Sequence, residues 1–137
     1  MARRLNVLIV DDSLIMRVNL VRSLEGIGHN IIAEADNGKS SIVSYEKYKP
    51  DLVTMDITMP DMDGITAVQK IKEIDADANV VMVTSHGQEA MVMNALKAGA
   101  KGYILKPVSP EKLREAIGKI FPELENTAID ELLDEEE

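Results

Sequence analysis

Five short apolar runs, separated by stretches with helical spacing, constrain the fold of this 137-residue chain more than any other feature. The runs lie at residues 5–10, 30–35, 51–55, 79–84 and 101–105, and they are largely continuous rather than alternating. A continuous apolar run indicates a strand that is buried on both faces, as in a parallel sheet covered by helices. The sequence therefore predicts an α/β fold in which parallel strands alternate with helices.

The segments between these runs carry apolar residues three and four positions apart, which is the pattern of a helix with one buried face. The predicted helices cover about residues 14–25, 39–49, 64–74, 88–98 and 110–121. We expect the buried faces to consist of Met16, Leu20, Leu24 and Ile27; Gly64, Ala67, Val68 and Ile71; Val92, Ala95 and Leu96; and Leu113, Ala116, Ile117 and Ile120. We interpret the alternation as a flavodoxin-like (βα)5 doubly wound parallel sheet with strand order 2-1-3-4-5.

The acidic residues are unevenly distributed along the chain. The formal net charge is −9, but residues 1–121 contain all 15 basic residues and 16 acidic ones, whereas residues 122–137 contain eight acids and no base. We therefore expect one domain over residues 1–121 and an acidic, mobile tail over residues 122–137. A docking helix built on Ala128, Ile129, Leu132 and Leu133 is the alternative for the tail.

Composition argues against two broad classes of partner. The body has no basic excess, and the chain has one Phe, three Tyr and no Trp, which disfavours nucleic-acid binding by charge or by stacking. The apolar runs are too short to cross a bilayer, and no signal peptide precedes the first strand, so we expect no membrane insertion. A soluble, cytoplasmic protein is therefore the expectation. The absence of cysteine excludes a disulfide framework and a thiolate metal site.

Polar side chains follow four of the five predicted strands. They are Asp11 and Asp12 after the first strand, Asp56 after the third, Thr84 and Ser85 at the end of the fourth, and Lys106 after the fifth. In a doubly wound sheet the carboxyl ends of the strands meet at one edge, where ligands bind. We therefore expect these side chains to share one shallow pocket.

Three carboxylates, a hydroxyl and an ammonium group at one sheet edge point to Mg²⁺ binding and phosphoryl transfer. Three crowded carboxylates raise each other's proton affinity, and a divalent cation with oxygen ligands, which favour Mg²⁺, removes the conflict. Lys106 and Thr84 would then contact phosphoryl oxygens, and Asp56 would be the nucleophile that forms an aspartyl phosphate. Taken singly, Thr84 is better explained as a strand residue and Lys106 as a loop residue. An Asp pair after a strand is often only a helix cap, but two adjacent Asp at this edge favour metal binding. The complete set favours phosphoryl chemistry.

Four motifs carry a resemblance to a known family. They are VDDS at residues 10–13, MDITMPDMDG at 55–64, VMVTS at 81–85 and AGAKGYILKPV at 98–108. With these motifs the chain resembles the receiver domain of two-component response regulators, most of all the stand-alone chemotaxis (CheY-like) type. The resemblance covers residues 5–121, and the motif set as a whole is highly specific.

The resemblance implies a role for each position at the predicted edge. Asp56 would be the phospho-acceptor, and Asp11, Asp12, Asp56 and the backbone carbonyl of Thr58 would bind Mg²⁺. Lys106, Thr84 and the backbone of Ser85 would bind the phosphate, and the Lys106–Pro107 peptide bond would be cis.

Two further pairs are implied to control signalling. Thr84 and Tyr103 occupy the switch positions, where phosphorylation draws the hydroxyl toward the phosphate and the ring moves inward behind it. The face made by the fourth helix, the fifth strand and the fifth helix would then change. Thr58 and His86 flank the path of the attacking water and would tune the lifetime of the phosphate. An ordinary core position is the alternative for Tyr103, and a solvated loop position is the alternative for His86.

The resemblance implies a single-domain response regulator of a two-component, chemotaxis-type system, rather than an enzyme acting on other molecules. A sensor histidine kinase, a downstream protein such as a flagellar motor switch protein, and a phosphatase would be its partners. A phosphorelay intermediate or phosphate sink is the alternative. A magnesium-dependent phosphatase of the haloacid dehalogenase type is more distant, because Thr58 stands where that family needs an Asp. A pure interaction module with an idle site would bind its partner equally well after Asp56→Asn.

Overall fold

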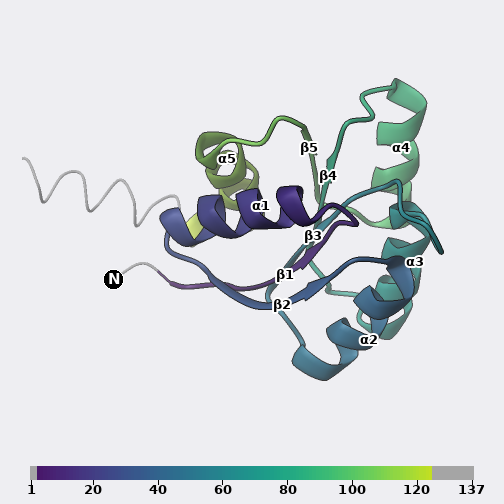
Figure 1. Ribbon diagram of the computed structural model, residues 1–137, viewed down its shortest axis with the longest axis horizontal. Coiled ribbons are helices and arrows are strands. Elements are labelled where there is room, and N and C mark those ends of the chain that lie inside the picture. The colour runs from purple at the N-terminus through teal and green to yellow at the C-terminus, as the bar shows by residue number, and fades with distance from the viewer. Residues whose placement is uncertain (1–2, 125–137) are drawn as a thin grey trace, which may run out of the picture.

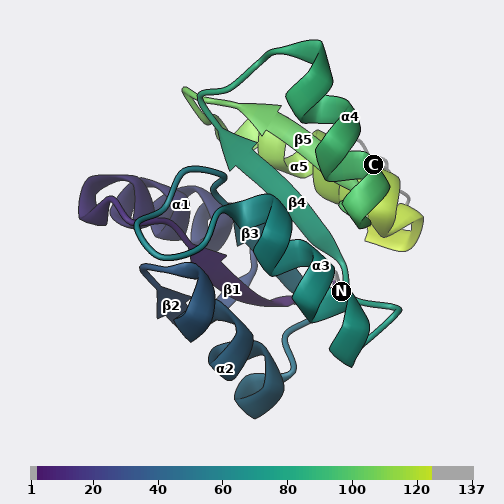
Figure 2. The same ribbon diagram turned by 90° about the vertical axis from the view of Figure 1, so that its right-hand side faces the viewer.

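Five strands and five helices alternate along the chain in the computed structural model, which describes residues 3–124 (Figure 1). In chain order they are β1 (Asn6–Val10), α1 (Leu14–Gly26), β2 (Asn30–Ala35), α2 (Gly38–Tyr48), β3 (Leu52–Met55), α3 (Gly64–Ile74), β4 (Val80–Thr84), α4 (Glu89–Ala98), β5 (Gly102–Leu105) and α5 (Pro110–Ile120). All strand pairs are parallel, and the order in the sheet is β2-β1-β3-β4-β5 (Figure 2). The predicted fold class and strand order are confirmed.

Helices cover both faces of the sheet, so the core has two layers. One layer packs against α2, α3 and α4, and the other against α1 and α5 (Figure 1). Every residue of the inner strands β3 and β4 is buried, whereas the edge strands β2 and β5 are partly exposed. This burial on both faces is the reason why the strand sequences read as continuous apolar runs.

Side-chain caps fix where four of the helices begin. Ser13, Asn37, Asp63 and Ser109 each accept a hydrogen bond from the backbone N–H three residues ahead. Such a cap satisfies one of the amide groups that have no partner within the helix. Gly38 is the first residue of α2, one residue before the predicted start of this helix.

The predicted buried faces are confirmed for α3 and α5 but not entirely for α4. Ala95 is fully buried, but Leu96 is 44% exposed and faces outward. The stripe of α4 that contacts the core runs through Met91, Ala95 and Ala98, at spacings of four and three residues. Leu96 lies about 100° around the helix from Ala95, so the expectation that it faces inward is wrong.

His29, to which the sequence assigns no role, has a structural one. Its ring is buried beside the amino end of β1, and Nδ1 accepts a hydrogen bond of 3.1 Å from the backbone N–H of Leu5. Burial lowers the pKa of His29 from its ordinary value, which favours the neutral form that this bond requires. His29 therefore caps the end of the sheet opposite to the polar strand ends.

The described part of the chain ends just after α5. Residues 122–124 form a helical turn, and Leu124 packs against the core layer beneath α1 and α5. The rest of the predicted acidic tail, including its apolar candidates between 128 and 133, lies outside the described residues. None of the helices within residues 3–124 has the length and apolar character needed to cross a membrane.

Candidate functional site

Three carboxylates meet at the carboxyl edge of the sheet. Strands β1 and β3 are neighbours, with Val10 opposite Met55, and the N–H of Asp56 donates to the carbonyl of Val10 at 3.0 Å. The residues that follow these strands are therefore adjacent in space. One carboxylate oxygen from each of Asp11, Asp12 and Asp56 lies within 4.8 Å of the other two. Asp11 and Asp56 are 1% and 6% exposed, whereas Asp12 is open to solvent.

Asp11 is held rigidly from both sides. One carboxylate oxygen accepts from the N–H of Ser13 at 2.9 Å, and the other accepts from Nζ of Lys106 at 2.9 Å. The guanidinium of Arg17 donates to the backbone carbonyl of Asp11 at 2.6 Å and pairs with Glu34 at 3.3 Å. Sequence reasoning missed Arg17, because its position one turn into α1 becomes informative only after the helix is placed.

Asp56 carries an electrostatic conflict. Burial is the largest cause that raises the pKa of its carboxyl group, and the charge of Asp11 adds to it. Lys106, whose Nζ lies 3.7 Å from Asp56, and the N–H of Ile57, which donates to the carboxylate at 2.9 Å, act in the opposite direction. The raised pKa shows that these two groups compensate only in part. A bound cation would supply the missing positive charge.

The loop from β3 to α3 is fixed by its own acidic residues. Asp61 accepts hydrogen bonds from the N–H groups of Gly38 and Lys39, at 3.0 and 3.2 Å, which ties the loop to the start of α2. Gly64 then lies against the backbone of Asp56, and its N–H donates to the carbonyl of Ile57 at 2.7 Å. A Cβ at Gly64 would lie 1.9 Å from the carbonyl oxygen of Asp56. Residue 64 must therefore be glycine, because its Cα lies too close to the backbone of Asp56 for any side chain.

His86 links the predicted switch residues to one another. Its backbone N–H donates to Oγ1 of Thr84 at 3.2 Å, and its carbonyl accepts from the hydroxyl of Tyr103 at 2.5 Å. Its ring nitrogen Nε2 lies 2.7 Å from Oγ1 of Thr58, two residues after Asp56. The sequence places Thr58 and His86 on either side of the expected path of the attacking water, but it did not predict the contact between them.

The remaining predicted site residues lie at the ends of β4 and on or after β5. Thr84 is fully buried at the end of β4, and within residues 3–124 no hydrogen bond joins its hydroxyl to the aspartates or to Lys106. Ser85 is exposed beside it. Tyr103 is half-buried against the core layer under α4, and burial raises the pKa of its hydroxyl. The Lys106–Pro107 peptide bond is cis, as the resemblance implies.

A comparison with protein families agrees with this geometry. The model of the response regulator receiver domain matches residues 7–118. The chain belongs to this family. It is therefore a CheY-like receiver of two-component signalling, and its cluster of Asp11, Asp12 and Asp56 fits the phosphorylation and magnesium site of such domains.

Individual relatives of this receiver domain are chemotaxis proteins. Chemotaxis protein CheY of Bacillus subtilis is 49% identical over 113 residues, which cover 82% of this chain and 94% of the relative. CheY of Thermotoga maritima is 46% identical over 114 residues, covering 83% and 95%. Among solved structures, the CheX–CheY–BeF3–Mg²⁺ complex from Borrelia burgdorferi matches with a TM-score of 0.82 and 40% identity, over 85% of this chain and 88% of the matched one.

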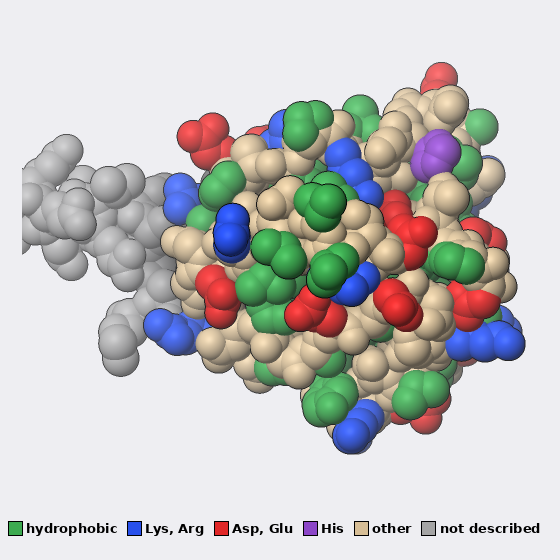
Figure 3. Space-filling model, viewed as in Figure 1, with side chains coloured by type: hydrophobic (Ala, Val, Ile, Leu, Met, Phe, Trp, Pro, Cys, Tyr) green, Lys and Arg blue, Asp and Glu red, His purple; other side chains and the backbone are tan. Residues whose placement is uncertain are grey.

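An exposed apolar patch lies beside the acidic cluster. Leu14, Ile15 and Val18, in the first turns of α1, are between 40% and 74% exposed. Figure 3 shows hydrophobic side chains gathered over this helix, with acidic and basic side chains next to them. Because α1 begins two residues after Asp12, a protein that docks on this patch would also reach the acidic site.

Proposed function

We propose that this receiver domain accepts a phosphoryl group on Asp56 from a sensor histidine kinase and then binds a downstream protein. The observation that carries the proposal is the buried Asp56 carboxylate, which lies within 4.8 Å of two further aspartates and 3.7 Å from Lys106. This arrangement combines a nucleophile, a set of oxygen ligands and a positive charge at one sheet edge. Domain boundaries at residues 1–121 for the receiver and 122–137 for the tail complete the proposal.

The donor set fits Mg²⁺. Asp11, Asp12 and Asp56 offer carboxylate oxygens, and the backbone carbonyl of Thr58 is the fourth proposed ligand. Oxygen ligands from few side chains, one of them open to solvent, match a cation that keeps part of its water shell. When bound, Mg²⁺ neutralises charge on the carboxylates and on the phosphoryl group.

The chain's own residues perform the transfer. A carboxylate oxygen of Asp56 attacks phosphorus in line, the phosphorus–nitrogen bond of the kinase phosphohistidine breaks, and its electron pair stays on the imidazole. Lys106, already 2.9 Å from Asp11 and 3.7 Å from Asp56, contacts a phosphoryl oxygen. The N–H of Ser85 and the hydroxyl of Thr84 donate to the others. Oγ1 of Thr84 accepts from His86, so its own hydrogen is free to be donated.

The same contacts connect the site to an output surface. If Thr84 turns toward the phosphate, the loop that contains His86 moves with it, and Tyr103 is bonded to the carbonyl of His86. Movement of Tyr103 changes the face formed by α4, β5 and α5. The chemotaxis names of its relatives support a flagellar motor switch protein as the partner at this face.

Two other partners follow from the surface and from the relatives. The apolar patch of Leu14, Ile15 and Val18 beside the acidic cluster suits a kinase helix that must bring its phosphohistidine to Asp56. The Borrelia burgdorferi relative forms a complex with CheX, which supports a dedicated partner, such as a phosphatase, at the phosphorylated site.

Binding of an amino-terminal peptide from a flagellar motor switch protein tests the output. The peptide is titrated into the full chain with and without Mg²⁺ and beryllofluoride, and Asp56→Ala is the control. We expect affinity to rise at least about fivefold on activation, which is the usual range of coupling between sites, and only with Asp56 present. Activation of the site without a gain in peptide affinity would instead indicate a phosphorelay intermediate or a phosphate sink.

The bond between Thr58 and His86 is expected to protect the phosphoryl group. It closes the rim between the loops after β3 and β4, where a water must enter to attack. His86→Ala should therefore shorten the phosphoryl lifetime about threefold to tenfold, or roughly 1 kcal/mol in activation free energy. The measurement is the decay of phosphoprotein after removal of the donor.

Thr58→Val is the matched variant for this prediction, because it removes the same bond from the other side. The two substitutions should have similar effects, and the double variant should add little to either one. Thr58→Ser, which keeps the hydroxyl, should be close to the native chain. An unchanged lifetime in His86→Ala would refute the protective role.

A further inference from the structure

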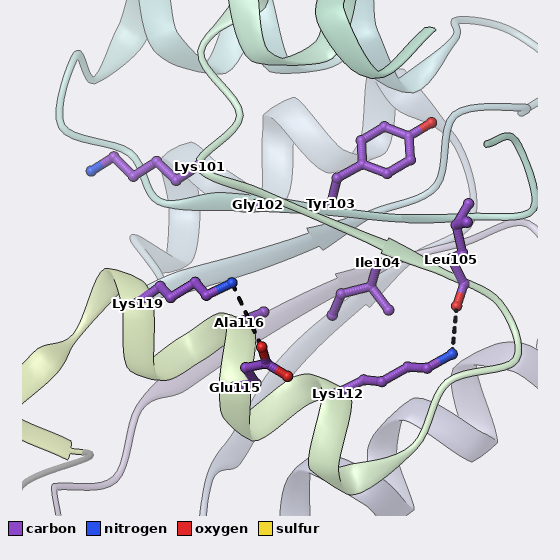
Figure 4. Close-up of a pocket in the computed structure, with 9 residues that line it drawn as sticks. All are labelled: Lys101, Gly102, Tyr103, Ile104, Leu105, Lys112, Glu115, Ala116 and Lys119. Atoms are coloured by element: carbon purple, nitrogen blue, oxygen red, sulfur yellow. Dashed lines mark hydrogen bonds and ion pairs between the residues drawn. The ribbon is translucent and has the colours of Figure 1, made fainter. Parts of the chain in front are cut away.

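A shallow groove of about 390 Å³ lies between β5 and α5, on the proposed output face (Figure 4). Lys112 and Lys119 border it on α5 with Glu115 between them, and Lys101 stands at the start of β5. In the part of the chain that the structure describes, β5 is an edge strand, so one side of its backbone is not paired with another strand. The groove is therefore suited to receive a further segment of chain.

The groove is positively charged on a body that is nearly neutral. Its lining holds three lysines and one glutamate, a formal charge of +2. Within residues 3–124, Nζ of Lys112 donates to backbone carbonyls alone, of Leu105 at 3.4 Å and Pro107 at 3.0 Å. Lys119 pairs with Glu115 at 3.7 Å, but both are exposed, and such pairs contribute little. Lys101 points away from α5, and its Nζ donates to Oδ1 of Asn79.

Residues 125–137 have the complementary composition. They contain seven acids and no base, together with Ile129, Leu132 and Leu133 at helical spacing. The segment starts directly after Leu124, which packs against the same core layer as α5. Thirteen residues reach up to about 40 Å when extended, whereas Lys112 and Lys119 are about 10 Å apart along the helix.

We propose that residues 125–137 dock into the groove between β5 and α5 of their own chain. The carboxylates face Lys112 and Lys119, and the apolar residues lie against Ala116 and the aliphatic parts of these lysines. Attachment at the end of α5 gives the segment a local concentration in the millimolar range, so weak contacts suffice. The tail then competes with any partner that uses this face. This last step rests on the proposed function, but the docking itself does not.

The charge distribution favours this groove over the other exposed apolar surface. The patch of Leu14, Ile15 and Val18 begins two residues after Asp12 of the acidic cluster. An acidic segment is repelled there and attracted by the lysines of α5. The groove between β5 and α5 is thus the surface that complements the negative charge of residues 125–137.

Amide resonances of the full chain test the docking. The native chain is compared with a full-length variant in which Asp130, Glu131, Asp134 and Glu135 are replaced by Asn or Gln. We expect amide shifts in residues 102–105 and 112–119, and we expect Lys112→Gln with Lys119→Gln to cause the same shifts. Added salt should reduce the difference between native and variant chains. Lys39→Gln with Lys70→Gln, two exposed lysines on α2 and α3, is the matched control.

Shifts confined to residues 120–124 would overturn the proposal, as would shifts that grow with protein concentration, because these indicate docking on a second copy. In the activated state, neutralising the tail should raise the affinity for a motor switch peptide about fivefold. If no such peptide binds, the proposed output fails, while the amide shifts still decide on the docking. If the peptide binds and the shifts are absent, only the docking fails.

Discussion

Replacement of Asp56 by asparagine is expected to abolish phosphoryl uptake from small phosphodonors and from a kinase. Asparagine preserves the shape of the side chain, but its amide lacks the negative charge and the nucleophilicity of a carboxylate. The loss should be complete rather than partial, because Asp11, the other buried aspartate of the cluster, is already bonded to Lys106 at 2.9 Å. Asp56 lies 3.7 Å from Lys106, which leaves its carboxylate available for the attack. Intact mass after incubation with donor and Mg²⁺ measures the uptake.

The same substitution should leave the protein folded and make it more stable. Burial and the charge of Asp11 raise the pKa of Asp56, so its ionised form costs free energy in the folded state. Removal of this charge should raise the free energy of unfolding by about 1 kcal/mol in urea without Mg²⁺. Asp77→Asn, at an exposed position after α3, is the matched control and should affect neither uptake nor stability. Uptake that persists in Asp56→Asn would place the acceptor elsewhere.

Gly64→Ala is expected to displace the backbone of Asp56 and to destabilise the fold. A Cβ at residue 64 would lie 1.9 Å from the carbonyl oxygen of Asp56, 2.8 Å from its carbonyl carbon and 3.0 Å from Cα of Ile57. These are backbone atoms, so no side-chain rotation relieves the contact, and the loop from β3 to α3 must move. We expect a loss of about 3 kcal/mol in the free energy of unfolding, at the upper end of overpacking effects.

The displaced loop carries both Asp56 and the carbonyl of Thr58, two of the proposed Mg²⁺ ligands. Mg²⁺ affinity should therefore fall at least about tenfold, since ligand positions matter within a few tenths of an ångström for this cation. Gly26→Ala is the matched control, because nothing lies within 4 Å of the added Cβ at the end of α1. Its stability should change by less than about 0.5 kcal/mol. An unchanged urea midpoint in Gly64→Ala would contradict the close approach.

The fold follows from the sequence because each strand is short, continuous in sequence and buried on both faces. The run at residues 80–84, for example, has every residue buried, so its apolar character alone indicates a central strand. The positions of Asp11 and Asp56 follow as well, since they come directly after strands that become neighbours. The order of the strands in the sheet is therefore enough to predict that these aspartates lie close together.

Features that depend on side-chain direction could not be predicted in this way. The outward position of Leu96 depends on how α4 is rotated against the core, and a helix of ten residues with apolar residues on several sides allows more than one rotation. The contacts of His86 join three segments that are distant in sequence, and no spacing rule predicts them. The close approach of Gly64 has a weak signal, since glycine after Asp63 is also an ordinary turn residue.

Locating the phosphoryl group in the native chain tests the central claim most directly. The protein is incubated with Mg²⁺ and a small phosphodonor and then reduced with borohydride, which converts an aspartyl phosphate to homoserine, and the peptides are sequenced by mass spectrometry. We expect homoserine at residue 56 alone, and none when Mg²⁺ is removed by chelation. Modification at Asp11 or Asp12, or no modification at residue 56 with Mg²⁺ present, would contradict it.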